Sequence, residues 1–155
     1  MSDTMLGGLV GSEEADILNR FDSLSYEEGD LIVREGEDSE GVFLVLRGSV
    51  SVLRLVTNSE EVAVGMIYPG EAFGEIGLFG TRRRISTIRA EEPTSVIMLT
   101  RQEFFKLRQN RPDVALKLLE KLFCQVADRF EKIQNEWLSD GFPCRRGKRE
   151  GEPVG

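Results

Sequence analysis

The sequence contains no histidine. Histidine is the usual general base near neutral pH and the commonest protein ligand of transition metals. The carboxylates are numerous, but they form no cluster at the spacing of a metal site. We therefore expect no enzyme, no metal and no cofactor, and a cupin-like metalloenzyme or a phosphodiesterase is disfavoured.

Cysteines are also scarce: only Cys124 and Cys144 occur, too far apart for a metal motif. The start of the chain lacks the basic segment and apolar core of a secretion signal, and no apolar run is long enough to cross a membrane. These absences predict a cytoplasmic protein with reduced thiols and no membrane contact.

Positive charge is in deficit, with 20 basic residues against 27 acidic ones and a net charge of −7. Nucleic-acid binding generally requires a basic face, so this balance argues against DNA as a partner. The run Arg82-Arg83-Arg84 is the dense basic cluster of the central region, and it indicates a local positive pocket.

The length of 155 residues suits one domain with short extensions. We expect a flexible N-terminus over residues 1–11, a domain over 12–138 that opens with a helix capped by Ser12, and a flexible tail over 139–155. Between about residues 24 and 99, short apolar runs alternate with glycine and turn residues. This texture predicts a mainly β fold, a jelly-roll-like β-roll or barrel with flanking helices.

Local signals define several of these elements. The runs 42–46 and 49–56 are separated by Gly48, which predicts a hairpin. Asn58-Ser59 predicts a turn into a further strand over 61–67.

The helical signals are equally local. Thr100 and Glu103 form the pattern of a capping box, which predicts a helix through about Gln109. Pro112 then opens a longer helix to about Leu138, so the C-terminal helices occupy about residues 101–138.

The long helix carries apolar residues at alternating gaps of three and four, which is a heptad seam. The seam consists of Leu116, Leu119, Phe123, Val126, Phe130, Ile133 and Trp137. Leu118 and Leu122 widen the stripe in its first half, as a helix packed on its own domain requires. The narrower second half predicts a homodimer contact through Phe123, Val126, Phe130, Ile133 and Trp137. Alternatively, the whole stripe covers the β domain.

Residues 70–90 combine glycines, a carboxylate and an arginine. Gly74 and Gly77 allow backbone N–H groups to approach an anion, and Arg84 offers a planar fork of donors to phosphate oxygens. Glu75 cannot bind phosphate, so it would accept hydrogen bonds from hydroxyl groups such as those of a ribose. The segment therefore predicts a site for a small phosphorylated ligand.

Other interpretations of these residues remain open. Glu75 could be a surface carboxylate, and Arg84 could form a salt bridge with it. Arg82 or Arg83 could take the place of Arg84, although strand alternation favours Arg84.

The spaced residues of this region resemble the cyclic nucleotide-binding domain family over about residues 24–137, and the GEIGLF run is similar to the bacterial catabolite-activator branch. The resemblance rests on Gly29, Gly36, Gly48, Gly70, Phe73-Gly74-Glu75, Gly77-Leu78, Arg84 and Ile88-Arg89-Ala90.

The resemblance implies a β-roll with a short phosphate-binding helix at residues 74–78. Glu75 would accept from the ribose 2′-hydroxyl, and Arg84 would bind the cyclic phosphate. Backbone donors would lie near Gly74, Ile76, Gly77 and Ser86. An apolar wall beside the ribose and base would consist of Val52, Val64, Ile67 and Phe73.

Three ligand-site positions depart from the family pattern. Ile85 follows the arginine, where many relatives carry a small or hydroxyl residue, so guanine preference loses one supporting feature. Activator relatives present threonine and serine to the adenine edge, whereas Arg129 and Phe130 stand there in this chain, and either could stack on the base. Cyclic AMP is therefore favoured over cyclic GMP.

The expected function is that of a stand-alone sensory module that binds a cyclic nucleotide and signals through its C-terminal helix to an unidentified effector protein. The activator relatives continue into a DNA-binding helix-turn-helix domain, and the sequence after Trp137 is too short for one. The alternative is a degenerate domain that acts as a dimerisation or scaffold module without ligand. The presence of both Glu75 and Arg84 favours binding.

Overall fold

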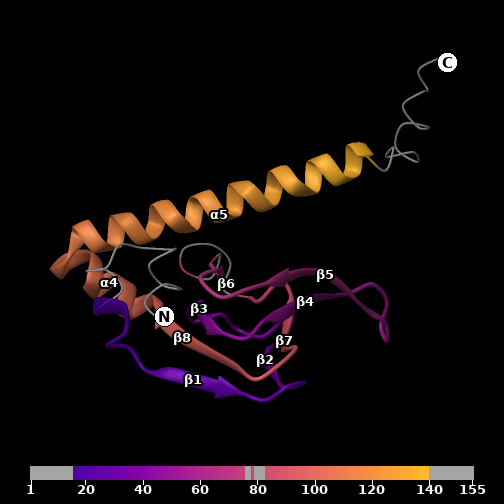
Figure 1. The fold of residues 1–155 in the computed structure, drawn as a ribbon, viewed down its shortest axis with the longest axis horizontal. Coiled ribbons are helices and arrows are strands. Elements are labelled where there is room, and N and C mark those ends of the chain that lie inside the picture. The colour runs from indigo at the N-terminus through magenta and orange to yellow at the C-terminus, as the bar shows by residue number, and fades with distance from the viewer. Residues whose placement is uncertain (1–15, 76–77, 79–82, 140–155) are drawn as a thin grey trace. The chain divides into compact units, whose positions relative to one another are not determined.

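The computed structural model describes residues 16–75, 78 and 83–139. The chain divides into two compact units, Met1–Leu122 and Phe123–Gly155. The first unit contains the strands and the second continues the last helix (Figure 1). The described strands are β1 (Ser23–Tyr26), β2 (Leu31–Val33), β3 (Gly41–Arg47), β4 (Val50–Leu55), β5 (Glu61–Ile67), β6 (Ala72–Phe73), β7 (Thr87–Ala90) and β8 (Thr94–Thr100).

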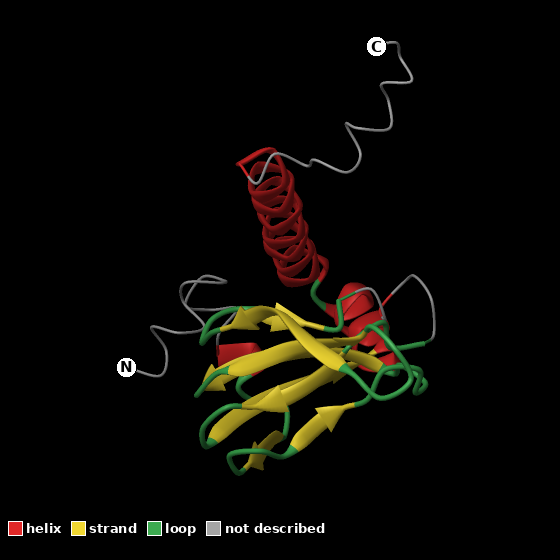
Figure 2. Cartoon of the chain, turned by 90° about the vertical axis from the view of Figure 1, so that its right-hand side faces the viewer, coloured by secondary structure: helices red, strands yellow, loops and turns green. Residues whose placement is uncertain are grey.

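The strands form two four-stranded antiparallel sheets, which Figure 2 shows one over the other. The order in one sheet is β1-β8-β3-β6, and the order in the other is β2-β7-β4-β5. The expected mainly β roll with flanking helices is thus confirmed.

Strand β3 explains why the sheets pack as they do, because it is apolar on both faces. Val42 and Leu44 point to one side and enter a core cluster with the helices. Phe43 and Val45 point to the other side and enter a cluster between the two sheets. The uninterrupted apolar run of β3 is what a strand buried on both faces requires.

The hairpin predicted across Gly48 is wrong. Strands β3 and β4 belong to different sheets, and β3 pairs with β6 and β8 instead. Gly48 has φ +85°, and a Cβ atom there would collide with the carbonyl of Pro93. The short connection is therefore a corner at which the chain changes sheets. The predicted turn before residues 61–67 is confirmed, since β4 pairs with β5.

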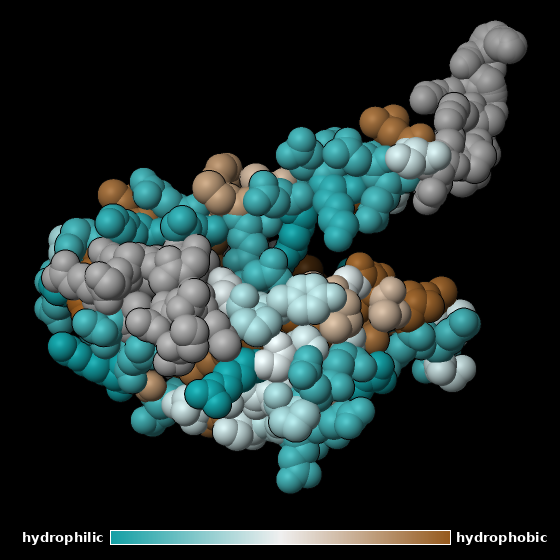
Figure 3. Space-filling model, in the orientation of Figure 1, coloured by the Kyte–Doolittle hydropathy of each residue, from teal (hydrophilic) through white to brown (hydrophobic). Residues whose placement is uncertain are grey.

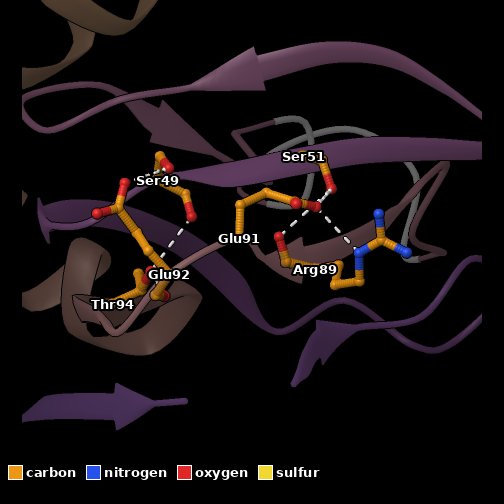
Figure 4. Close-up of polar contacts among 6 residues, drawn as sticks. All are labelled: Ser49, Ser51, Arg89, Glu91, Glu92 and Thr94. Atoms are coloured by element: carbon orange, nitrogen blue, oxygen red, sulfur yellow. Dashed lines mark hydrogen bonds and ion pairs between the residues drawn. The ribbon is translucent and has the colours of Figure 1, made fainter. Parts of the chain in front are cut away.

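A second corner lies against the first, between β7 and β8, and polar side chains join the two (Figure 4). The Ser49 hydroxyl donates to Glu92 Oε2 at 2.6 Å, and the Thr94 hydroxyl donates to the carbonyl of Ser49 at 3.2 Å. Beside them, Ser51 and Arg89 both donate to Glu91 Oε2, at 2.5 and 3.0 Å. These contacts satisfy the buried hydroxyls where the sheets meet.

The two C-terminal helices begin where the sequence predicts. At the start of α4 (Arg101–Asn110), the Glu103 N–H donates to Thr100 Oγ1 at 3.0 Å and the Thr100 N–H donates to Glu103 Oε1 at 2.9 Å. The predicted capping box is thus confirmed. Helix α5 (Pro112–Ser139) follows directly, and its first turns are buried through Val114, Ala115, Leu118 and Leu122.

The termini of the chain fall largely outside this description. Residues 16–18 are helical, but the predicted cap Ser12 lies outside the described residues. The segments 1–11 and 139–155, predicted to be flexible, also lie outside them apart from Ser139. No helix in the described part is long and apolar enough to cross a membrane.

Candidate functional site

Arg84 is the central feature of the site because it is a buried cation. Its exposed fraction is 7%. Its Nη1 donates to the carbonyl of Gly41 at 3.1 Å, and its Cζ lies 5.3 Å from the centroid of the Phe43 ring. Its backbone pairs with the turn at Gly36-Glu37, through bonds of 2.8 and 2.7 Å. Both the backbone and the side chain of Arg84 are therefore held in place.

Gly74 lies directly against this guanidinium. Its φ is +76°, a conformation that residues with a Cβ rarely adopt. A Cβ atom at this position would collide with Nη1 of Arg84. The glycine thus serves two physical needs, a left-handed backbone and room for the guanidinium.

The hydrogen bonds of Arg84 are incomplete. Its Nε is buried and has no partner in the described part of the chain. Burial lowers the pKa of the Arg84 guanidinium, and Glu37 and Glu40 oppose that shift. A buried donor without an acceptor costs about 1–3 kcal/mol, so the site is chemically matched to an anion.

The loop beside Arg84 connects the site to helix α4. Gly41 accepts the hydrogen bond from Arg84. Two residues earlier, the carbonyl of Ser39 accepts from Nη2 of Arg101 at 3.1 Å, and the carbonyl of Glu40 accepts from the backbone N–H of Arg101 at 2.8 Å. Residues 39–41 are therefore held by two arginines: Arg84 of the candidate site and Arg101 of helix α4.

The remaining residues of the predicted phosphate-binding segment are only partly described. Glu75 is half-buried and starts a turn whose Leu78 N–H donates to the Glu75 carbonyl at 3.1 Å. Leu78 is buried in the helical cluster. Ile76 and Gly77 lie outside the described residues.

Three members of the predicted apolar wall come together and one does not. Ile67 and Phe73 belong to the cluster between the sheets, and Val52 packs against it. Val64 is 59% exposed on β5, at the register shift where Val52 pairs with Gly65 and Leu53 with Ala63.

The neighbours of Arg84 differ sharply from it. Arg83 is exposed, and its Nη1 donates to the carbonyl of Gly36 at 3.1 Å. Ile85 is 49% exposed and Ser86 is half-buried. Arg82 lies outside the described residues. Of the described arginines in the triplet, Arg84 alone is turned into the protein.

Arg129 and Phe130 belong to the second compact unit, Phe123–Gly155. Phe130 is 61% exposed, and Arg129 is half-buried. Their predicted contact with the base stays a prediction.

The sequence reasoning missed Phe43 and Gly41. The Phe43 ring stacks on Phe73, with centroids 4.8 Å apart and planes within 9°, and forms a floor under Arg84. The sequence could have indicated Phe43, because an aromatic residue in a strand that is buried on both faces must face one of the two cores. Gly41 has no room for a Cβ atom beside the carbonyl of Leu99.

The comparison with protein families gives this geometry a context. The model of the cyclic nucleotide-binding domain matches residues 23–111. The chain belongs to the cyclic nucleotide-binding domain family. Within the described residues of the domain, no group of three or more ligand-type side chains could hold a metal ion.

Two curated proteins illustrate the relationship of the domain. It is 28% identical over 103 residues to the cAMP-dependent protein kinase regulatory subunit of Blastocladiella emersonii, covering 66% of this chain and 26% of that protein. It is 26% identical over 111 residues to the cAMP-activated global transcriptional regulator CRP of Salmonella typhimurium, covering 71% and 53%. The chain thus spans less than two thirds of either relative.

Solved structures agree on the fold. The domain is 28% identical to the catabolite activator protein of Thermus thermophilus, with a TM-score of 0.69 over 87% of this chain and 63% of that chain. A cyclic nucleotide-binding domain from Methylobacillus flagellatus gives a TM-score of 0.80 over 90% and 83%, at 20% identity. At that identity the second match shows the fold alone.

Proposed function

We propose that this domain binds a cyclic nucleotide at Arg84 and Gly74 and reports the bound ligand to an effector protein. The observation that carries the proposal is the buried Arg84 guanidinium, whose Nε has no acceptor within the described residues. A phosphate would supply that acceptor, and its negative charge would offset the cost of burying the cation. Glu75 follows Gly74 directly and would accept from the ribose hydroxyl.

Cyclic AMP is the proposed ligand in preference to cyclic GMP. Both curated relatives described above carry cAMP in their names. Ile85 offers no hydroxyl at the position where some members of the family bind guanine. Arg129 or Phe130 would stack on the base.

The response to ligand would start at the loop over residues 39–41. A phosphate that draws Nη1 of Arg84 from the carbonyl of Gly41 would loosen one of the bonds on this loop. Arg101 holds the other end of the loop at the start of α4. The coupling between ligand and helix can be no larger than the difference in ligand affinity between the two conformations.

A homodimer through the second half of α5 is also part of the proposal. Phe123 is 73% exposed and Phe130 is 61% exposed, and further apolar residues of the same seam are exposed as well. Figure 3 shows hydrophobic residues between hydrophilic ones along this helix. A seam of this kind is buried when two helices pair.

The proposal places the protein in the cytoplasm, where a free thiol such as that of Cys124 stays reduced.

Isothermal titration with cyclic AMP and cyclic GMP tests the ligand directly. Arg84→Ala is expected to weaken binding of the preferred nucleotide by about ten- to a hundredfold or more, because it removes charge-assisted hydrogen bonds of about 1.5–3 kcal/mol. Arg83→Ala is the matched control, since Arg83 is exposed beside it, and its affinity should equal that of the wild type.

Urea unfolding of each variant without ligand shows whether the fold is intact. If the wild-type protein gives no heat with either nucleotide up to millimolar concentration, the binding proposal is rejected. The ligand-free dimerisation or scaffold module would then be favoured.

A further inference from the structure

A pocket of about 840 Å³ lies on helix α4, and Arg84 is not among its lining residues. Its floor is apolar and is formed by Leu78, Phe104 and Phe105. Its rim is basic and carries Arg101, Lys106 and Arg108. Leu78 and Phe104 are buried in the core, whereas Phe105 is 49% exposed and is accessible to a binding partner.

The helical period brings these residues together. Arg101, Phe105 and Arg108 are spaced by four and three residues, so they lie on one face of α4. The Cζ of Arg108 lies 4.8 Å from the centroid of the Phe105 ring. This arrangement keeps a cation beside the exposed aromatic ring.

The charge of the pocket is opposite to that of the protein. The chain carries a net charge of −7, yet three cations gather on this short helix. The carboxylate of α4, Glu103, accepts from the Thr100 N–H in the capping box. Within the described residues, no carboxylate pairs with Lys106 or Arg108. Lys106 and Arg108 are exposed, and exposed cations beside an apolar hollow favour an anionic partner.

We propose that this pocket is a docking site for an acidic segment of a partner protein, with a bulky apolar side chain packed against Phe105. Carboxylates that flank the inserted side chain would pair with the basic rim. A nucleic acid or an anionic lipid surface fits less well, because the concave floor is apolar and the rest of the protein is acidic.

The docking site does not depend on the proposed ligand, although Arg101 also holds the loop beside Arg84. The test therefore uses the protein without nucleotide. Its probe is a short fluorescein-labelled synthetic peptide in which leucine and phenylalanine alternate with pairs of glutamates. A second peptide replaces every glutamate by lysine.

Fluorescence anisotropy should show saturable binding of the glutamate peptide, and amide chemical-shift changes should map to α4. Lys106→Glu and Phe105→Ala should each weaken binding by about tenfold, because they remove rim charge and apolar floor. Lys121→Glu, an exposed charge reversal on α5, is the matched control and should leave binding unchanged. Lys106→Glu should leave cyclic AMP binding at the wild-type affinity, which separates this test from that of the nucleotide site.

Three results would overturn the proposal. The lysine peptide could bind as tightly as the glutamate peptide, or the shifted amides could lie away from α4. Alternatively, a single-stranded oligonucleotide could displace the bound peptide, which would assign the surface to nucleic acid.

Discussion

At the residue scale, the chemistry of the site depends on environment more than on residue type. Arg83 and Arg84 are identical side chains, yet one is exposed and the other has an exposed fraction of 7%. Adjacent residues in extended backbone point in opposite directions, so only one of the two can enter the protein. The buried one lies against Gly74 and over Phe43.

Gly74→Ala tests this close approach. The new Cβ would collide with Nη1 of Arg84, and φ of +76° would be strained by about 1–2 kcal/mol. We expect cyclic AMP binding to weaken by about tenfold or more, since one charge-assisted hydrogen bond is misplaced. Isothermal titration and urea unfolding measure the two effects.

Gly29→Ala provides the comparison for Gly74→Ala. Gly29 also has a positive φ, of +92°, but a Cβ there meets nothing within 4 Å. This variant should lose stability through backbone strain but keep the affinity of the wild type. Equal affinities for the two alanine variants would contradict the role given to Gly74.

At the element scale, the sheets are joined by corners in which hydroxyls meet carboxylates. Ser51 is 2% exposed, and its hydroxyl donates to Glu91 Oε2 at 2.5 Å. The hydrogen bond from Ser51, followed by that from Arg89, lowers the pKa of Glu91. A carboxyl group with a lowered folded-state pKa stabilises the fold only while it is ionised.

Glu91→Gln should therefore lower the free energy of unfolding by up to about 1 kcal/mol at neutral pH, a modest value because the side chain is partly exposed. The difference from the wild type should be fully present above the unfolded-state pKa of about 4.3. It should disappear as the pH falls through the lower folded-state pKa. Urea unfolding over a series of pH values measures it.

Ser51→Ala should reproduce most of this loss at neutral pH, because it removes the first of the two donors to Glu91. A difference between wild type and Glu91→Gln that stayed constant down to acid unfolding would show that ionisation of Glu91 is not its source.

At the scale of the whole molecule, α5 presents two different faces. Val114, Ala115, Leu118 and Leu122 face the core of the first unit. Leu116 is 58% exposed, and most of the seam residues that follow it in the sequence are also exposed. At 100° per residue, Phe123 lies one step around the helix from Leu122. The seam and the buried stripe are therefore adjacent on the helix, and Leu119 of the seam packs against the core of the first unit.

Phe130→Asp tests the proposed homodimer. A carboxylate in the middle of a paired seam would be buried against its copy, which is strongly unfavourable. Sedimentation velocity should show a dimer for the wild type and a monomer for this variant, with and without cyclic AMP.

Glu131→Lys, the neighbouring exposed position off the seam, should remain dimeric and is the control. A wild-type protein that sediments as a monomer at high concentration in both conditions would refute the homodimer.

Patterns that involve residues close together in the sequence predicted the structure reliably. The capping box at Thr100 and Glu103 involves residues within one turn, and α4 begins there as predicted. The hairpin predicted at Gly48 failed because its spacing suits two outcomes, a tight turn within a sheet or a corner between sheets. Contact with Pro93 and Thr94, far away in the chain, selects the corner.

The sequence by itself determined the class of fold, the start of both C-terminal helices and the type of ligand chemistry, because these follow from local backbone preferences and from functional groups. Only the tertiary structure decided which arginine is buried, that Phe43 and Gly41 hold it, and that a basic pocket forms on α4. Those features depend on contacts between residues from distant parts of the chain. Local backbone preferences carry no information about such contacts.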